Sequence, residues 1–481
     1  MIELFNINNI FLEASFCAFI CITLILVFLP KIEKNKNFWF IFFCSLIAIA
    51  IYLQFNIPFV ETLSFSNLFI NDSLSWHVKV SILIGFLLIA VYSRNFLQSS
   101  DVNGYLEFYV LSLFLGLGAF IMVSSNHYLS MYLGLELLSL STCVIVALSN
   151  NKNLNIEASV KFFVLSALSS GFLLFGISLL YGATGTLFFS ELTEIMNSGD
   201  YNKFLLSFSL VFLVSAIAFK IGVIPFHMWL PDVYEGSSYT SLTLISSIPK
   251  IAGFALIYRI LDAGFFQGYQ YNDYQQFFSI LAILSVIFGN LIAIAQVNLK
   301  RMIAFSTISH MGFLLFSFIG NSPELGQPVA YLYTIVYFFS NILLFGLILR
   351  VSSFNDQVSS IYDLKGLNRR NPLYAFLILF IMLSLAGIPP TIGFWAKLSV
   401  INLLVNAGFV YFALIAIIFS VVGAFYYLRI IKIVYFDVGD FKYQVETDKL
   451  FDVVITVNGF ILLSFGLAPG LIINMIQNIF L

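Results

Sequence analysis

The sequence predicts an all-α polytopic membrane protein. Hydrophobic residues make up 60% of the 481 residues, charged residues only 10%, and the mean hydropathy is +0.99. Soluble domains usually carry about a quarter charged residues. The apolar runs are long and unbroken, which excludes a β-barrel, because barrel strands alternate over ~10 residues. At ~20 residues per span, the chain accommodates about fourteen transmembrane helices.

The expected helices follow the apolar runs in order. The stretch 56–76 is more polar and partly alternating, so we expect an extended or hairpin loop there. The first apolar run has no basic region before it and no cleavage site, which favours a membrane helix over a signal peptide. The expected helices cover residues 10–29, 37–55, 78–97, 108–125, 128–148, 156–182, 203–225, 240–261, 276–296, 302–319, 329–351, 372–397, 410–435 and 451–479.

Charge and cysteine content exclude several functions. The net charge is −2 and no basic patch is present, which argues against nucleic acid. The four cysteines lie within apolar segments, where they are expected to pack as small hydrophobic residues. No run of cysteines could hold an iron–sulfur cluster, and no GxGxxG motif follows a strand. We therefore expect no cofactor and no metal in this chain.

Basic residues alternate between the two sides of the predicted membrane protein. Because positive residues stay on the cytoplasmic side, both termini are expected outside. The basic residues on the expected inner side are Lys31, Lys34, Lys36, Arg94, Lys152, Lys300, Arg301, Lys365, Arg369, Arg370, Lys442 and Lys449.

Prolines interrupt two of the expected helices. Pro225 follows Lys220 in the seventh helix, and Pro389-Pro390 precede Lys397 in the twelfth. Proline removes a helical hydrogen bond and clashes with the preceding turn. Such breaks in corresponding places predict two inverted five-helix repeats. The chain then divides into 1–104 (helices 1–3), 105–262 (helices 4–8), 263–436 (helices 9–13) and 437–481 (helix 14).

Charged residues inside the expected helices are candidates for an ion pathway, since a charge at mid-membrane costs at least ~2.5–3.5 kcal/mol. Glu136 has no charged neighbour in sequence, and Lys220 is the nearest charge at similar depth. A static ion pair between two helices is the alternative, but buried pairs stabilise poorly. Lys250 lies in an apolar helix, which favours a pathway role over snorkelling.

Three further residues keep two interpretations each. Lys161 fits a relay group or a surface pair with Glu157 four residues earlier. His227, near the break of the seventh helix, suits proton relay, or else a capping or interface role. His310 is a relay group or a satisfied core histidine. Lys397 mirrors Lys220 and completes the series.

Several stretches surround these residues, namely LGLELLSL, EASVKFFVLSALSSGFLLFGISLLYGATGT, AFKIGVIPFHMWLPDVYEG, PKIAGF, NLKRMIAFSTISHMGF and SLAGIPPTIGFWAKL. Together they resemble the antiporter-like subunit family of bacterial NADH:quinone oxidoreductase, respiratory complex I. The loop 232–236 and the end of the chain after the fourteenth helix resemble one branch of that family. The family's usual prolines after Gly236 are absent here, which affects only the start of the eighth helix.

The resemblance implies proton translocation, coupled to quinone reduction elsewhere in the complex. Glu136 and Lys220 would form the coupled pair, Lys250 the central relay and Lys397 the exit-side group, with Lys161 and His227 as further positions. NADH, FMN, iron–sulfur clusters and quinone would belong to partner subunits. The expected partners are neighbouring membrane subunits and lipids, and the expected location is the bacterial inner membrane. A subunit of a related multi-subunit cation/proton antiporter is the alternative, since it would contain the same lysines.

Overall fold

The computed structural model describes residues 10–29, 35–57, 61–98, 104–148, 152–199, 201–265, 271–320, 323–352, 358–439 and 448–480. Both termini therefore lie outside the described residues. So do Lys31, Lys34 and Lys442 of the basic loops that predicted the orientation.

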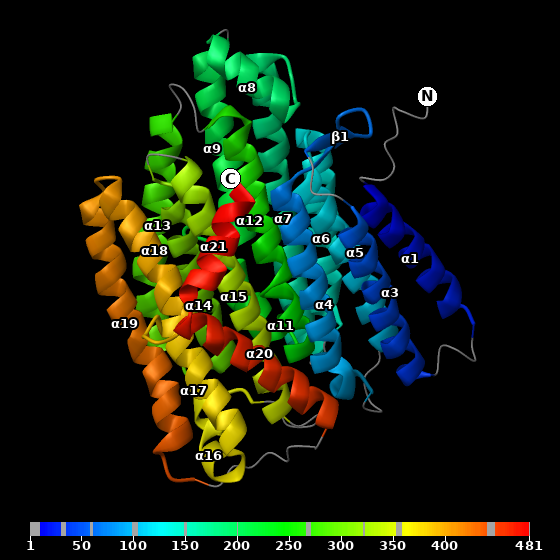
Figure 1. The fold of residues 1–481 in the computed structure, drawn as a ribbon, viewed down its shortest axis with the longest axis vertical. Helices are drawn as coiled ribbons and strands as arrows, with labels where there is room; N and C mark the ends of the chain where they lie inside the picture. The colour runs from blue at the N-terminus through cyan, green and yellow to red at the C-terminus, as the bar shows by residue number, and fades with distance from the viewer. Residues whose placement is uncertain are drawn as a thin grey trace. The chain divides into compact units, whose positions relative to one another are not determined.

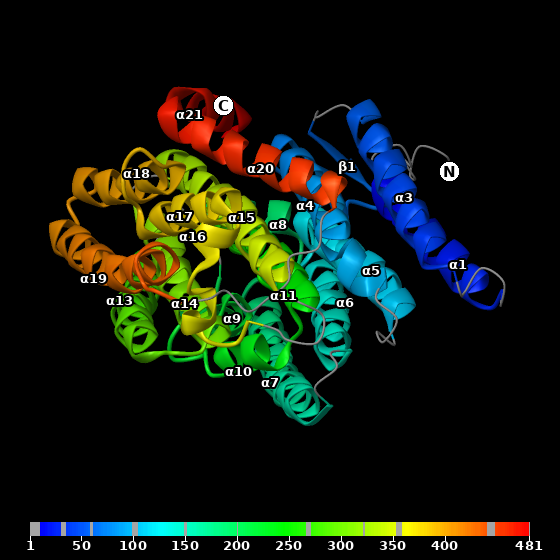
Figure 2. The ribbon, with the colours of Figure 1, turned by 90° about the horizontal axis from the view of Figure 1, so that it is seen from below.

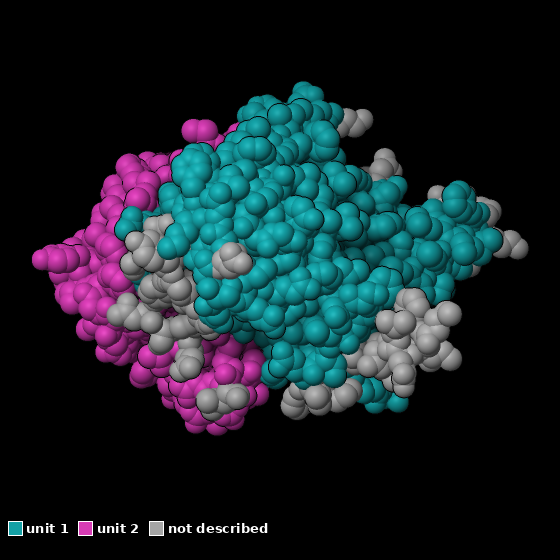
Figure 3. Space-filling model, turned by 90° about the horizontal axis from the view of Figure 1, so that it is seen from above, with its two compact units in different colours: residues 1–90, 97–221, 248–277 teal, residues 91–96, 222–247, 278–481 magenta. Residues whose placement is uncertain are grey.

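The chain folds into two compact units, which Figure 3 colours separately. The first comprises residues 1–90, 97–221 and 248–277, and the second residues 91–96, 222–247 and 278–481. These units reflect compactness and do not test the predicted division into repeats, so the four-part division and the inverted repeats stay predictions.

Unit 1 is a helical bundle with a small hairpin. Figures 1 and 2 both show its first two helices side by side. Its elements are α1 (Phe11–Val27), α3 (Lys36–Asn56), β1 (Thr62–Ser64), β2 (Phe69–Asn71), most of α4 (Ser73–Gln98), α5 (Tyr105–Ser124), α6 (Tyr128–Ala147), α7 (Lys152–Thr184), α8 (Phe189–Ser198), α9 (Lys203–Ile221), α12 (Ile248–Ile260), the π-helix η3 (Leu261–Phe265) and the start of α13 (Tyr271–Ala295).

Unit 2 contains most of α13 and all later helices. Near the end of the chain two helices meet at an angle, as Figure 1 shows. The elements are α10 (Trp229–Gly236), α11 (Tyr239–Ile245), α14 (Leu299–Ser317), α15 (Pro323–Val351), the 3-10 helix η4 (Ile361–Leu364), α16 (Leu367–Arg370), α17 (Pro372–Ala386), α18 (Ile392–Asn406), α19 (Val410–Tyr435), α20 (Lys449–Leu467) and α21 (Pro469–Phe480).

The described helices have the length and composition of membrane spans. Eleven helices in the described part of the chain are long and apolar enough to cross a membrane, and α1, α17 and α18 are shorter apolar helices. The fold is therefore the predicted all-α polytopic membrane fold. The count of about fourteen helices stays a prediction.

The predicted hairpin is present, and one other loop differs from expectation. β1 and β2 pair antiparallel within the stretch expected to be a hairpin. The polar loop after the sixth expected helix contains α8, whose Phe189, Leu192 and Met196 are buried. Their i, i+3, i+7 spacing is that of a helix with one apolar face, a signal hidden by the polar residues between them.

The eighth helix, predicted as continuous over residues 240–261, is two helices. α11 ends at Ile245 and α12 begins at Ile248. Pro249 explains the interruption, because its ring clashes with the carbonyl four residues earlier, that of Ile245. Ser238 caps α11, and its hydroxyl accepts a hydrogen bond from the Ser241 amide. The serines that replace the family's prolines therefore still begin a helix.

The two predicted breaks are present in the structure. α9 ends at Ile221, and Gly222 follows with φ +80°. α17 ends at Ala386, and Gly387 follows with φ +80°. Glycine adopts this left-handed conformation without steric cost, and the prolines that come next prevent the helix from resuming. Each break leaves helix-terminal carbonyls without intrahelical partners.

Glycines bring α5 and α6 into close contact. A Cβ on Gly118 would lie 2.6 Å from the Leu138 amide nitrogen, and one on Gly134 would lie 2.7 Å from the Met122 nitrogen. Small residues that let helix backbones approach are typical of membrane helix interfaces. Because Glu136 follows Gly134 by two residues, this contact fixes the part of α6 that carries the carboxylate.

Candidate functional site

Glu136 and Lys220 lie in unit 1 on α6 and α9, and serines stand between them. The Lys220 ammonium donates to the hydroxyls of Ser139, at 2.7 Å, and Ser166, at 2.9 Å. The Ser170 hydroxyl donates to Glu136. Among the described residues, no ion pair joins the two charges directly, although each lies within the electrostatic range of the other. Serine hydroxyls are therefore hydrogen-bond partners of both charged groups, although different serines contact each one.

No motif in the sequence marks these serines. Ser166 and Ser170 lie one turn apart on α7, and Ser139 follows Glu136 by three residues on α6. Residues three or four positions apart share a helix face. The signal was thus the helical spacing of small hydroxyl side chains beside charged residues, inside otherwise apolar segments.

Lys250 binds the end of the broken helix in unit 1. Its side chain is 1% exposed, and its ammonium donates to the Ile221 carbonyl at 2.6 Å. Ile221 is the last residue of α9, so this carbonyl is one that the break leaves unpaired within the helix. The negative end of the helix dipole also favours a cation there. Lys250 therefore caps the end of α9 at Ile221, the residue that directly follows Lys220.

Lys397 makes the corresponding contact in unit 2. Its ammonium donates to the carbonyls of Leu385, at 3.0 Å, and Ala386, at 2.8 Å. These are the last two residues of α17, so Lys397, on α18, caps the helix before its own break. The close packing of α18 on α17 depends on Gly393, where a Cβ would lie 1.9 Å from the Ser384 carbonyl oxygen.

His310 lies beside Lys397 at a small cavity in unit 2. Its Nδ1 is 2.6 Å from the Tyr333 hydroxyl and its Nε2 is 3.0 Å from the Tyr427 hydroxyl, so both ring nitrogens have partners. The cavity is small, with a volume of about 20 Å³. It is lined by His310, Tyr333, Val336, Tyr337, Ser340, Ser384, Leu385, Gly393, Ala396 and Lys397.

Lys161 and His227 make other contacts in the described part of the chain. Lys161 pairs with Glu157 at 2.7 Å, and their side chains are 45% and 60% exposed, which matches the surface-pair interpretation. His227 lies between α9 and α10, is partly exposed, and its Nδ1 is 3.4 Å from the Pro225 carbonyl. A relay role for either residue stays a prediction.

Lys300 and Arg301, two of the basic residues on the expected inner side, have specific partners in the structure. Lys300 is buried and donates to the Ser237 carbonyl at 2.6 Å, at the end of α10. Arg301 pairs with Asp232 at 3.1 Å and Glu235 at 2.7 Å. The Glu235 carboxylate and Asp232 raise the pKa of Arg301, which keeps this guanidinium charged.

No group of three His, Cys, Asp or Glu side chains in the described part of the chain could hold a metal ion. The four cysteines are free thiols. The side chains at the sites described above are carboxylates, amines, an imidazole and hydroxyls, all of which can exchange protons.

Comparison with known proteins places this arrangement in a class. The family described as "NADH:quinone oxidoreductase/Mrp antiporter, TM" matches residues 125–423, which include the Glu136–Lys220 site, Lys250, His310 and Lys397. The chain belongs to this family of antiporter-like membrane subunits.

Within the family, the chain is similar to proteins named NADH-quinone oxidoreductase subunit N. It is 41% identical to the one from Herminiimonas arsenicoxydans, over 96% of this chain and 95% of the relative. A chain of respiratory complex I from Thermus thermophilus superposes with a TM-score of 0.82 at 27% identity, over 96% of this chain and 98% of that one. A chain of the Mrp complex from Dietzia sp. matches at 18% identity, over 99% and 97% of the two chains, with a TM-score of 0.83, a likeness of fold alone.

Proposed function

We propose that this chain is a proton-translocating membrane subunit of an NADH:quinone oxidoreductase. The observation that carries the proposal is the contact between a buried lysine and the carbonyls freed by a helix break, which occurs in both units. A buried amine is costly unless it has partners, and intramembrane lysines mark ion pathways. The named relatives and the complex I structure support the same function.

In unit 1 Glu136 and Lys220, each bonded to serine hydroxyls, can exchange protons in a defined way. While Glu136 is ionised, its charge favours the ammonium form of Lys220. When Glu136 is protonated, Lys220 loses this stabilisation and releases a proton, and the hydroxyls of Ser139 and Ser166 are its nearest hydrogen-bond partners. Lys250 is placed to follow, since it holds the carbonyl of the residue next to Lys220.

In unit 2 the proposed transfer involves Lys397 and His310. Both line the same cavity, and the tyrosine hydroxyls on the imidazole supply further groups that donate and accept protons. Lys397 is the proposed exit-side group. Its carbonyl partners let the amine stay hydrogen-bonded in either protonation state.

We propose that the redox groups, namely NADH, FMN, iron–sulfur clusters and quinone, belong to partner subunits, and that this chain carries none. The proposed partners are neighbouring antiporter-like and small membrane subunits, together with lipids. The proposed location is the bacterial inner membrane.

Two variants of Lys220 test the proton-transfer role. Lys220→Arg keeps a charge for Glu136 but replaces the amine by a guanidinium, which does not release its proton in proteins. We expect both Lys220→Arg and Lys220→Ala to assemble and to fail to pump. The measurement is NADH-driven proton uptake by membrane vesicles, normalised to the amount of assembled complex.

A static ion pair predicts the reverse order, in which the arginine variant pumps normally and the alanine variant does not assemble. That outcome would refute the proposal. Purification without flavin and iron–sulfur subunits would instead favour the cation/proton antiporter.

The proposed orientation places both termini outside and α16 on the inner side. A cysteine introduced by Asn368→Cys should not react with a membrane-impermeant thiol reagent added to intact cells, but should react in inside-out vesicles. Ready labelling in intact cells would reverse the orientation.

A further inference from the structure

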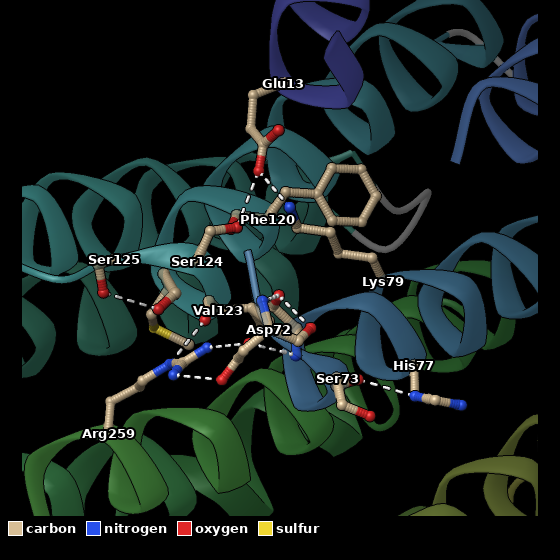
Figure 4. Close-up of polar contacts among 12 residues, drawn as sticks. Glu13, Asp72, Ser73, His77, Lys79, Phe120, Val123, Ser124, Ser125 and Arg259 are labelled. Carbon is tan, nitrogen blue, oxygen red and sulfur yellow. Dashed lines mark hydrogen bonds and ion pairs between the residues drawn. The ribbon is translucent and has the colours of Figure 1, made fainter. Parts of the chain in front are cut away.

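Unit 1 contains a second buried acid–amine pair, which is separate from the site described above. Glu13 of α1 and Lys79 of α4 form an ion pair of 2.6 Å, and their side chains are 6% and 1% exposed. Figure 4 shows the two side chains pointing toward each other, with Ser124 of α5 beside them. Glu13 and Lys79 lie outside the stretch that the family description matches.

Glu13 accepts a hydrogen bond from a serine hydroxyl, as Glu136 does. The Ser124 hydroxyl has two acceptors in reach, Oε1 of Glu13 at 2.8 Å and the Phe120 carbonyl, four residues earlier, at 2.9 Å. Ser170 likewise has the Glu136 carboxylate and a carbonyl four residues earlier. A hydroxyl with two acceptors can turn away when the carboxylate gains a proton, so the carboxylate can change its protonation state.

The Glu13–Lys79 pair contrasts with a second ion pair nearby, between Asp72 and Arg259. Both carboxylate oxygens of Asp72 accept from Arg259, each at 2.7 Å, and Oδ1 also accepts from the Ser75 amide. Arg259 Nε donates to the Val123 carbonyl at 3.0 Å. Burial alone would raise the pKa of Asp72, but the Arg259 guanidinium holds it below its ordinary value. This pair is saturated with hydrogen bonds and suits a fixed link between elements.

Glu13 is not saturated. Its Oε2 atom is buried and has no hydrogen-bond partner among the described residues. A buried carboxylate oxygen without a partner is costly while it is charged, and protonation removes that cost. The carboxylate of the Glu13–Lys79 pair is therefore less fully hydrogen-bonded than that of the Asp72–Arg259 pair, which lies at the same end of α5 (Figure 4).

The place of the pair in the fold gives it access to one face of the unit. α1 and α4 begin at this end of the bundle, while α5 and α12 end there. Lys79 lies six residues into α4, which is about 9 Å along the axis at ~1.5 Å per residue. The Asp72 side chain, at the start of α4, is 19% exposed, so this end reaches the surface.

We propose that Glu13 and Lys79 form a second proton-transfer pair, which exchanges protons at the face of unit 1 where α1 and α4 begin. This inference rests on the proposed function of the chain. A proton from that face binds Glu13 Oε2 and forms an O–H bond, which neutralises the carboxylate. Lys79 then lacks its counter-charge, and one of its N–H protons passes to a water molecule, which becomes hydronium, so that one proton enters and one leaves.

The groups that face the pair set its environment. Cys17, one turn further along α1, lies within electrostatic range of Glu13. His77, two residues before Lys79 on α4, lies on a different side of that helix, with its Nδ1 2.7 Å from the Ser73 carbonyl. On α5 the facing group is the neutral Ser124. Lys79 is thus the charged partner within ion-pair distance of Glu13 among the described residues.

The test replaces both members of the pair with neutral residues of similar shape. Glu13→Gln/Lys79→Gln leaves no unpaired charge, so the complex should assemble, since removing both partners of a buried ion pair is often neutral. We expect proton uptake per assembled complex to fall at least about tenfold, because a proton-transfer group typically contributes ~10²–10⁴-fold to its step. Glu13→Asp, which keeps the charge but draws the carboxylate back, should assemble and pump less than the unmodified chain.

The matched control is Asp72→Asn/Arg259→Gln, which neutralises the saturated pair. It should lower the amount or the thermal stability of the complex and leave uptake per assembled complex unchanged. Normal pumping by the Glu13→Gln/Lys79→Gln variant would overturn the inference. If Lys220→Arg fails in the same vesicles while this variant pumps normally, only the second pair is refuted; if Lys220→Arg also pumps, the proposed function fails as well.

Discussion

The two broken helices, α9 in unit 1 and α17 in unit 2, end in the same way but are capped from different places. Each ends just before a glycine with φ +80° and a proline-containing turn. In unit 2 the cap is Lys397, which lies on α18 just after the break. In unit 1 the cap is Lys250, which comes from α12, while Lys220 in the last turn of α9 reaches serines. By contact, the counterpart of Lys397 is Lys250 and not Lys220.

The largest expected effect on proton uptake comes from removing the two lysines that cap the broken helices. Lys250→Met and Lys397→Met each remove a titratable group and leave helix-terminal carbonyls without their partner. We expect proton uptake per assembled complex to fall at least about tenfold in both, or ~1.4 kcal/mol in the barrier. Lys432→Met, at an exposed position on α19, is the control and should pump normally. If one cap variant matches this control, the two breaks are not functionally equivalent.

A smaller effect is expected from crowding one cap without removing it. Gly387 and Gly408 both have positive φ, +80° and +83°. A Cβ at Gly387 would lie 2.6 Å from Lys397 Cδ, whereas one at Gly408 would meet nothing within 4 Å. Both alanine variants should lose ~1–2 kcal/mol of stability from the backbone alone, measured by thermal unfolding. Only Gly387→Ala should also slow proton uptake, and equal uptake in the two variants would show that the position of Lys397 is unimportant.

The smallest effect concerns the serines that distinguish the unit 1 site. Ser166→Ala removes one of two hydroxyl partners of Lys220 and leaves Ser139 in place. We expect a loss of ~0.5–1.5 kcal/mol, seen as a severalfold slower uptake. Ser159→Ala, on the same helix, removes only a bond to the Ile156 carbonyl and serves as the control. Identical rates in the two variants would mean that the Ser166 hydroxyl does not contribute to proton transfer at Lys220.

The sequence by itself determined the membrane class, most helix positions and the two breaks. Long apolar runs have no other stable fold in lipid, and a proline in a helix has a local effect that its own covalent structure dictates. Intramembrane charges such as Glu136, Lys250 and Lys397 were likewise evident, because each stands alone in an apolar run.

Only the tertiary structure decided which groups meet. Whether Lys250 or Lys220 reaches the end of α9 depends on how α12 packs against it, and no local pattern encodes that contact. The serines between Glu136 and Lys220 come from two helices, and the Glu13–Lys79 pair joins residues more than sixty positions apart. These contacts depend on packing between helices, which is set by the whole unit, whereas helices and breaks are set by neighbours along the chain.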